Sequence, residues 1–157
     1  MTIETRWATP ADAPQVAELA TALTREIIKV TGVAHFHVDQ AQSTRLAEQL
    51  LAAGKYVALL AWQEGRPIGL AGCCESHALY AEGSFGVVQE FYVVPELRSA
   101  GVGAILLQAV SAYGETRGWQ RLELCTPPLP DFARSLAFYE RNGFAVTGGR
   151  KMKLLLA

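Results

Sequence analysis

Two segments of this 157-residue sequence contain residues that are suited to chemistry. In the first segment, an arginine and two glycines follow a strand-like run. The apolar, β-branched residues 87–94 predict a strand that ends at Pro95. Arg98, Gly101 and Gly103 follow and predict the start of a helix. Glycines let backbone N–H groups approach a ligand closely, and a helix start carries partial positive charge. This loop is therefore suited to bind a pyrophosphate.

The second segment, residues 136–144, combines three aromatic side chains with a glycine that ends a helix. Tyr139 offers a hydroxyl with an ordinary pKa of about 10. Taken alone, Phe138, Tyr139 and Phe144 are equally typical of core aromatics around a helix end. Glu90, on the strand of the first segment, supplies a carboxylate that can accept a proton.

Two common phosphate motifs are excluded for the loop. A Walker loop needs Gly-Lys-Ser/Thr after its gap, and a dinucleotide fingerprint needs a third glycine where this chain has Leu106. The spacing Arg-x-x-Gly-x-Gly after Glu-Phe-Tyr-Val, with Phe-Tyr-Glu-x-x-Gly-Phe about forty residues later, resembles the GCN5-related N-acetyltransferase (GNAT) family. The resemblance extends over essentially the whole chain, because the order of the expected elements also matches.

The resemblance implies that acetyl-CoA lies between two splayed parallel strands, residues 87–94 and 121–125. Unpaired backbone groups of Val93 and Val94 would bind its pantetheine arm, and the loop would bind its pyrophosphate. The contacts expected for this co-substrate are Tyr92, Val93, Val94, Arg98, Ser99, Ala100, Gly101, Val102, Gly103 and Ala104. No metal is expected.

The implied reaction is attack of a primary amine, from a small-molecule or peptide acceptor, on the acetyl thioester in a ternary complex. An alkylammonium with a pKa near 10 must first lose a proton, and Glu90 is the candidate base. Two alternatives stay open for Glu90: it binds the substrate ammonium, or it has no part in the chemistry. An amide near Val93 or Val94 would stabilise the oxyanion.

Tyr139 matches the general acid of the family. A tyrosine is a weaker acid than a thiol of pKa about 8.5, so the expected role is stabilisation of the departing thiolate rather than full proton transfer. A non-catalytic acyl-CoA-binding or sensing module on the same scaffold is the alternative. The presence of both Glu90 and Tyr139 favours the enzyme, because a binding module needs only the phosphate loop.

The rest of the sequence predicts the elements that position these residues. Apolar residues at helical spacing predict helices over residues 10–31, 39–53, 102–113 and 131–142, the last capped by Asp131. Apolar runs predict strands at 3–8, 56–62, 67–74, 87–94 and 121–125, and a final hairpin at 144–147 and 151–156. Residues 75–83 are expected to form a polar connection. This order predicts one α/β domain over residues 1–157, a mixed sheet with helices on both faces in the GNAT-type fold.

Composition limits the partners. With 14 basic and 15 acidic residues, the net charge of −1 gives no electrostatic basis for binding nucleic acid or an anionic membrane. No apolar run approaches the length of a spanning helix, and the N-terminus lacks the apolar region of a signal peptide, so a cytoplasmic protein is expected. The three cysteines are expected to be reduced, buried small hydrophobes. A homodimer stays open.

Two further patterns carry weaker predictions. His35 and His37 lack a third and fourth ligand, so a metal is not expected there. The resemblance instead implies that residues 31–38, together with 76–83 and 127–132, surround the acceptor. A covalent route through Cys125 is disfavoured, because the sequence places no histidine base beside it.

Overall fold

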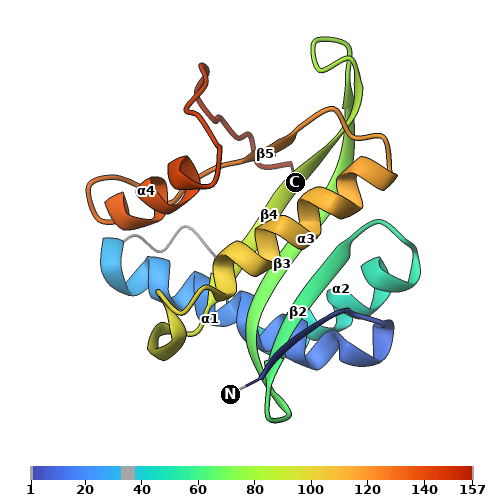
Figure 1. Cartoon of the computed structure of the whole chain (residues 1–157), viewed down its shortest axis with the longest axis vertical. Helices are drawn as coiled ribbons and strands as arrows, with labels where there is room; N and C mark the ends of the chain where they lie inside the picture. The colour runs from blue at the N-terminus through green and yellow to red at the C-terminus, as the bar shows by residue number, and fades with distance from the viewer. Residues whose placement is uncertain (1, 33–37, 157) are drawn as a thin grey trace.

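A computed structural model describes residues 2–32 and 38–156 and shows a mixed five-stranded sheet (Figure 1). In spatial order the strands are β1 (Ile3–Trp7), β2 (Val57–Gln63), β3 (Arg66–Ala78), β4 (Gly83–Val93) and β5 (Leu122–Leu124). The first four are antiparallel neighbours, and β5 runs parallel to β4. The expected mixed sheet is confirmed.

Helices cover both faces of this sheet, as expected. They are α1 (Ala13–Thr31), α2 (Gln40–Ala52), α3 (Val102–Thr116) and α4 (Ala133–Arg141), with single turns η1 (Pro10–Asp12) and η2 (Pro95–Leu97). In Figure 1, α3 crosses one face of the sheet, and α1 and α2 lie behind the other. No helix in the described ranges is both long enough and apolar enough to cross a membrane.

The core lies between the sheet and these helices. Leu106 and Val110 on α3 and Leu70 on β3 are fully buried. Gly69 on β3 brings α3 close, because a Cβ there would lie 3.1 Å from Leu106 Cδ1. Apolar residues at helical spacing on α3 thus meet the alternating residues of the strands, and this packing holds α3 across the sheet.

The sequence prediction is wrong at three ends of elements: the end of β3 and the beginnings of β4 and α4. β3 and β4 extend through residues 75–78 and 83–86, so only residues 79–82 form the turn in place of the expected connection. Backbone pairing in a ladder does not require apolar side chains, which is why the polar sequence concealed it. Asp131 does not cap α4: Phe132 takes that position with no capping side-chain bond, while its N–H donates to the carbonyl of Pro128 at 3.1 Å.

The expected final hairpin does not form in the described residues. Residues 144–156 contain no strand, and Val146, Met152 and Leu154 are 74%, 90% and 84% exposed. Apolar residues form a strand only where a neighbouring edge accepts their hydrogen bonds and a surface buries their side chains. β5, the adjacent edge strand, is only three residues long and offers little of either.

The cysteines do not share one environment. Cys73 is buried and Cys74 is partly buried, but Cys125 is exposed, and all three are free thiols. The expectation of three buried cysteines is therefore wrong for Cys125. It directly follows the three-residue strand β5, which buries little of the chain around it.

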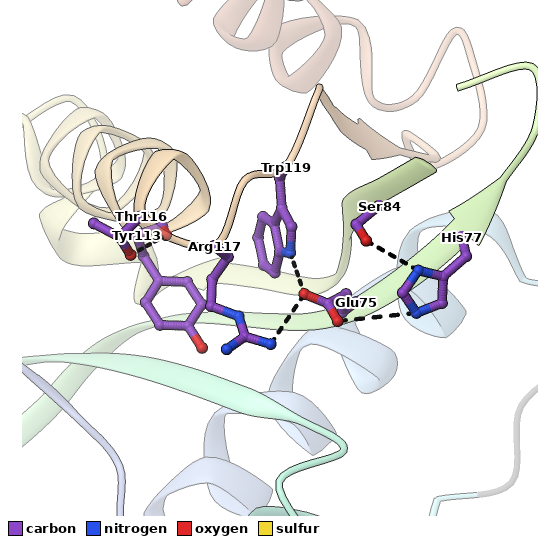
Figure 2. A network of polar contacts seen from close by, with 7 residues as sticks. All are labelled: Glu75, His77, Ser84, Tyr113, Thr116, Arg117 and Trp119. Atoms are coloured by element: carbon purple, nitrogen blue, oxygen red, sulfur yellow. Dashed lines mark hydrogen bonds and ion pairs between the residues drawn. The ribbon is translucent and has the colours of Figure 1, made fainter. Parts of the chain in front are cut away.

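Glu75 anchors the chain between α3 and β5 to β3 (Figure 2). Trp119 Nε1 and Arg117 Nη2 donate to Glu75 Oε1 at 2.7 and 3.2 Å. The Trp119 ring lies against two glycines: a Cβ at Gly86 on β4 or Gly114 on α3 would come within 2.3 or 2.7 Å of it. These contacts place the beginning of β5 beside β4.

Candidate active site

β4 loses its neighbour β5 halfway along its length. The parallel pairing joins residues 86–88 of β4 to residues 122–124 of β5 and extends no further in the described structure. At the same point the register against β3 shifts: Glu90 lies opposite Gly72, whereas Val88 lies opposite Cys73. Gln89 is therefore an extra, bulged residue. A bulge bends its strand and redirects the side chains beside it, which accounts for the separation of β4 from β5.

Beyond the bulge, the ladder determines which backbone groups of β4 are free. Val94 N–H donates to the carbonyl of Ile68 at 3.0 Å, and its own carbonyl accepts from Leu97 N–H at 3.0 Å. The expectation of an unpaired Val94 backbone is therefore wrong. Since antiparallel pairing alternates, the N–H and C=O of Val93 point away from β3, toward the side that β5 has left. The Val93 carbonyl accepts from Arg98 Nε at 2.9 Å. The N–H of Val93 has no acceptor within the described residues.

The loop before α3 presents a row of free amides. Ser99 and Gly101 both adopt left-handed backbone conformations, with φ of 71° and 88°. In the described part of the chain, the N–H groups of Ser99 and of residues 101–104 have no acceptor, whereas Ala100 N–H donates to the carbonyl of Leu97. These free groups lie at the positive end of α3, the usual place for a bound phosphate.

The two glycines of the loop serve different purposes. Gly101 has open space around it, with no atom within 4 Å of a Cβ, but its φ of +88° strains any other residue. At Gly103 a Cβ would lie 2.8 Å from Phe138 Cζ. Gly103 therefore makes room for α4 against the start of α3, in addition to any approach of a phosphate.

The charge of Arg98 is paired within the protein. Its Nη1 and Nη2 donate to Glu26 of α1 at 3.0 and 2.8 Å, and its guanidinium lies 5.3 Å from the centre of the Tyr92 ring. Glu26 neutralises the guanidinium in this structure. The free positive character of the loop thus comes from its amides.

Glu90 is partly buried and has one hydrogen-bond partner in the described structure. Tyr56 donates its hydroxyl proton to Glu90 Oε1 at 2.7 Å. Burial raises the pKa of Glu90 above its ordinary value, and the hydrogen bond from Tyr56 opposes this change. Tyr56 is not among the residues that the sequence predicts for the site. No local signal could have identified it, because the residue precedes β2 and reaches Glu90 only through the folding of the sheet.

Tyr139 lies in an aromatic cluster on α4. Its ring centre is 5.4 to 5.8 Å from those of Phe138, Phe144 and Phe91. Burial raises its pKa to about 12, and its hydroxyl makes no hydrogen bond to any described residue. Phe91 directly follows Glu90 on β4, and neighbouring residues of a strand face opposite sides. Glu90 and Tyr139 thus approach the same stretch of β4 from its two faces.

Other features of the chain add no group to this site. No cluster of three potential metal ligands occurs among the described residues. His35 and His37 lie outside those residues. Two small cavities, of about 50 and 160 Å³, lie beside Tyr56 and Tyr113, and no residue predicted for the site lines either of them.

Comparison with known proteins agrees with this geometry. The model of the acetyltransferase (GNAT) family matches residues 19–144, and the chain belongs to this family of acyltransferases. A search of the curated proteins found no match.

Solved structures share the fold at low sequence identity. A predicted acetyltransferase from Clostridium acetobutylicum, solved with acetyl-CoA, is 17% identical with a TM-score of 0.79, covering 98% of this chain and 96% of its own. An aminoglycoside acetyltransferase from an uncultured soil metagenomic sample is 17% identical with a TM-score of 0.76, covering 99% and 97%. A ribosomal-protein-alanine N-acetyltransferase from Brucella melitensis biovar Abortus 2308 is 21% identical with a TM-score of 0.73, covering 98% and 100%.

Proposed function

We propose that this protein transfers the acetyl group of acetyl-CoA to a primary amine of a small-molecule or peptide acceptor, with both substrates bound together. The observation that carries the proposal is the position of the free amides at the start of α3, directly after the stretch of β4 that has separated from β5. Such an arrangement offers a pyrophosphate site and, just before it along the chain, an open strand edge for an extended amide-containing arm.

The residues present fit this co-substrate. The amides of Ser99 and of residues 101–104 would bind the pyrophosphate, and the Val93 N–H would bind the arm. Acetyl-CoA, when bound, supplies an acetyl group activated as a thioester. Arg98 would form an ion pair with the pyrophosphate only if its ion pair with Glu26 broke. While that ion pair is kept, Arg98 holds the loop against α1. Tyr92, Val94 and Ala100 would hold the loop in position rather than bind the pyrophosphate.

Two side chains would assist the reaction, one by accepting a proton and the other by donating a hydrogen bond. Glu90 in its ionised form would accept the proton of the acceptor ammonium directly or through water. Tyr139 would donate a hydrogen bond to the sulfur that takes up negative charge. With a pKa raised to about 12, Tyr139 stays protonated throughout the physiological range, which suits a hydrogen-bond donor better than a proton donor.

A screen of acceptors tests the proposal directly. Amino acids, aminoglycosides, polyamines and peptides with a free N-terminus are incubated with acetyl-CoA, and release of the coenzyme A thiol is measured. We expect turnover with at least one class, and small-molecule amines are favoured, because an aminoglycoside acetyltransferase shares this fold. Tight binding of acetyl-CoA without turnover would support the non-catalytic module instead.

We also propose that the protein acts in the cytoplasm, where acetyl-CoA is available.

The phosphate site predicts a specific loss of affinity in Gly101→Ala. The new methyl group would enter the open space before α3 and strain the left-handed backbone that aims the amides. We expect the affinity for acetyl-CoA, measured by calorimetry, to fall about tenfold or more, because hydrogen bonds to charged groups contribute about 1.5–3 kcal/mol.

Gly118→Ala is the matched control. Gly118 also has a left-handed φ, of +74°, and no atom within 4 Å of a Cβ, but it follows the other end of α3. Both variants should lose about 1–2 kcal/mol of stability, and only Gly101→Ala should lose affinity. Equal affinities in the two variants would remove the loop from the site.

A further inference from the structure

Tyr56 reaches Glu90 by passing over the backbone of β3. Tyr56 directly precedes β2, and β3 lies between β2 and β4 in the sheet. Gly72 of β3 lies opposite Glu90 in the register, and a Cβ on Gly72 would lie 1.6 Å from the Tyr56 hydroxyl oxygen. Only a glycine at this position leaves room for the tyrosine.

We propose that Tyr56, accommodated by Gly72, is the positioning residue that orients the Glu90 carboxylate to accept the acceptor's proton. The inference rests on the proposed acetyl transfer. It assigns a role to a side chain that touches neither substrate and acts through Glu90.

The hydrogen bonds of the carboxylate support this role. Glu90 Oε1 accepts from Tyr56, whereas Oε2 has no hydrogen-bond partner among the described residues. One oxygen is thus held in place and the other is left for the proton. The bulge at Gln89, directly before Glu90, is the type of irregularity that redirects a side chain at a site.

The groups around Glu90 are neutral at physiological pH. They are the hydroxyl of Tyr56, from the segment before β2, and the thiols of Cys73 and Cys74, from β3. Burial raises the pKa of Cys73 to about 12 and also raises the pKa values of Cys74 and Tyr56. No cation forms an ion pair with Glu90 in the described chain, so the Tyr56 hydroxyl is the group that stabilises its ionised form.

The test is the pH profile of Tyr56→Phe. Removing the hydroxyl destabilises the ionised carboxylate, so the pKa of Glu90 rises. Because the base must be ionised, the acid limb of kcat/KM should move to higher pH by about one to two units, the size expected for a hydrogen bond to a charged group. At a pH below both limbs kcat/KM should therefore fall about ten- to a hundredfold, with an unchanged KM for acetyl-CoA. Gly72→Ala, which displaces the same hydroxyl, should move the limb in the same direction.

Tyr113→Phe is the control for loss of a tyrosine hydroxyl. Tyr113 lines the same two cavities as Tyr56, and its hydroxyl makes no hydrogen bond to a described residue. Its pH profile should match that of the unaltered protein. A shift in this variant equal to that of Tyr56→Phe would overturn the assignment.

A second measurement separates this inference from the proposed function. The titration of the Glu90 carboxyl carbon, followed by NMR in the unaltered protein and in Tyr56→Phe, needs no turnover. An unchanged titration would overturn the role of Tyr56, even if acetyl transfer is observed. Absence of turnover with every acceptor would reject the proposed function, whereas a raised Glu90 pKa in the variant would still establish that Tyr56 controls this carboxylate.

Discussion

Replacing Glu90 by glutamine should lower kcat at neutral pH by about 10²- to 10⁴-fold, the usual contribution of a general base. Glutamine is nearly the same size as glutamate, and its side-chain carbonyl can still accept the hydrogen bond from Tyr56. The substitution therefore removes the charge and the basicity while leaving the packing of β4 in place. Steady-state rates with the best acceptor measure the effect.

The pH dependence of Glu90→Gln distinguishes the three roles considered for this residue. If Glu90 is the base, the defect shrinks as the pH approaches 10, because the acceptor amine then loses its proton without help. If it only binds the ammonium, KM for the acceptor rises while kcat is kept. If it is only structural, neither parameter changes and the proposal for Glu90 fails. Glu18→Gln, on an exposed position of α1, is the control for loss of a negative charge.

Replacing Tyr139 by phenylalanine should lower kcat by about 10- to 10³-fold and leave the affinity for acetyl-CoA within about twofold. The phenylalanine ring keeps the contacts with Phe91, Phe138 and Phe144, so only the hydroxyl is lost. The hydroxyl is expected to stabilise the thiolate as charge develops on it. Rates and calorimetric affinities of the same preparation give both quantities.

The leaving group provides the decisive comparison for Tyr139. A thioester of a more acidic thiol needs less stabilisation, so the defect of Tyr139→Phe should be smaller with such an acetyl donor. The basic limb of the pH profile below pH 10 should be the same in both proteins, because a tyrosine with a pKa of about 12 does not titrate there. An unaltered kcat would make Tyr139 a packing residue. Tyr113→Phe again controls for loss of a hydroxyl.

Local patterns predicted the segments that form the site. The end of β4 near Pro95 and the beginning of α3 after Gly101 depend on residues close in sequence, through the restricted backbone of proline and the freedom of glycine. The helix that carries Tyr139 was predicted for the same reason, although its first residue was not. The final hairpin was predicted from its apolar residues but depends on an edge that β5 does not supply.

Long-range pairing decided how the site is assembled. Glu26 binds Arg98 from α1, and Phe138 of α4 occupies the space above Gly103, although each pair is distant in sequence. The Gln89 bulge exists only relative to β3, and it directs the chain where β4 leaves β5. These contacts follow from how the helices and strands pack against one another, and no spacing along the chain encodes them.

The sequence by itself determined the family and predicted the candidate phosphate loop and the two candidate catalytic side chains, because these depend on neighbouring residues. The tertiary structure alone decided that Glu90 and Tyr139 approach β4 from opposite faces, that Arg98 is already paired, and that Tyr56 holds the carboxylate. The physical reason is that hydrogen bonds and ion pairs between distant segments form only after the hydrophobic packing has brought those segments together.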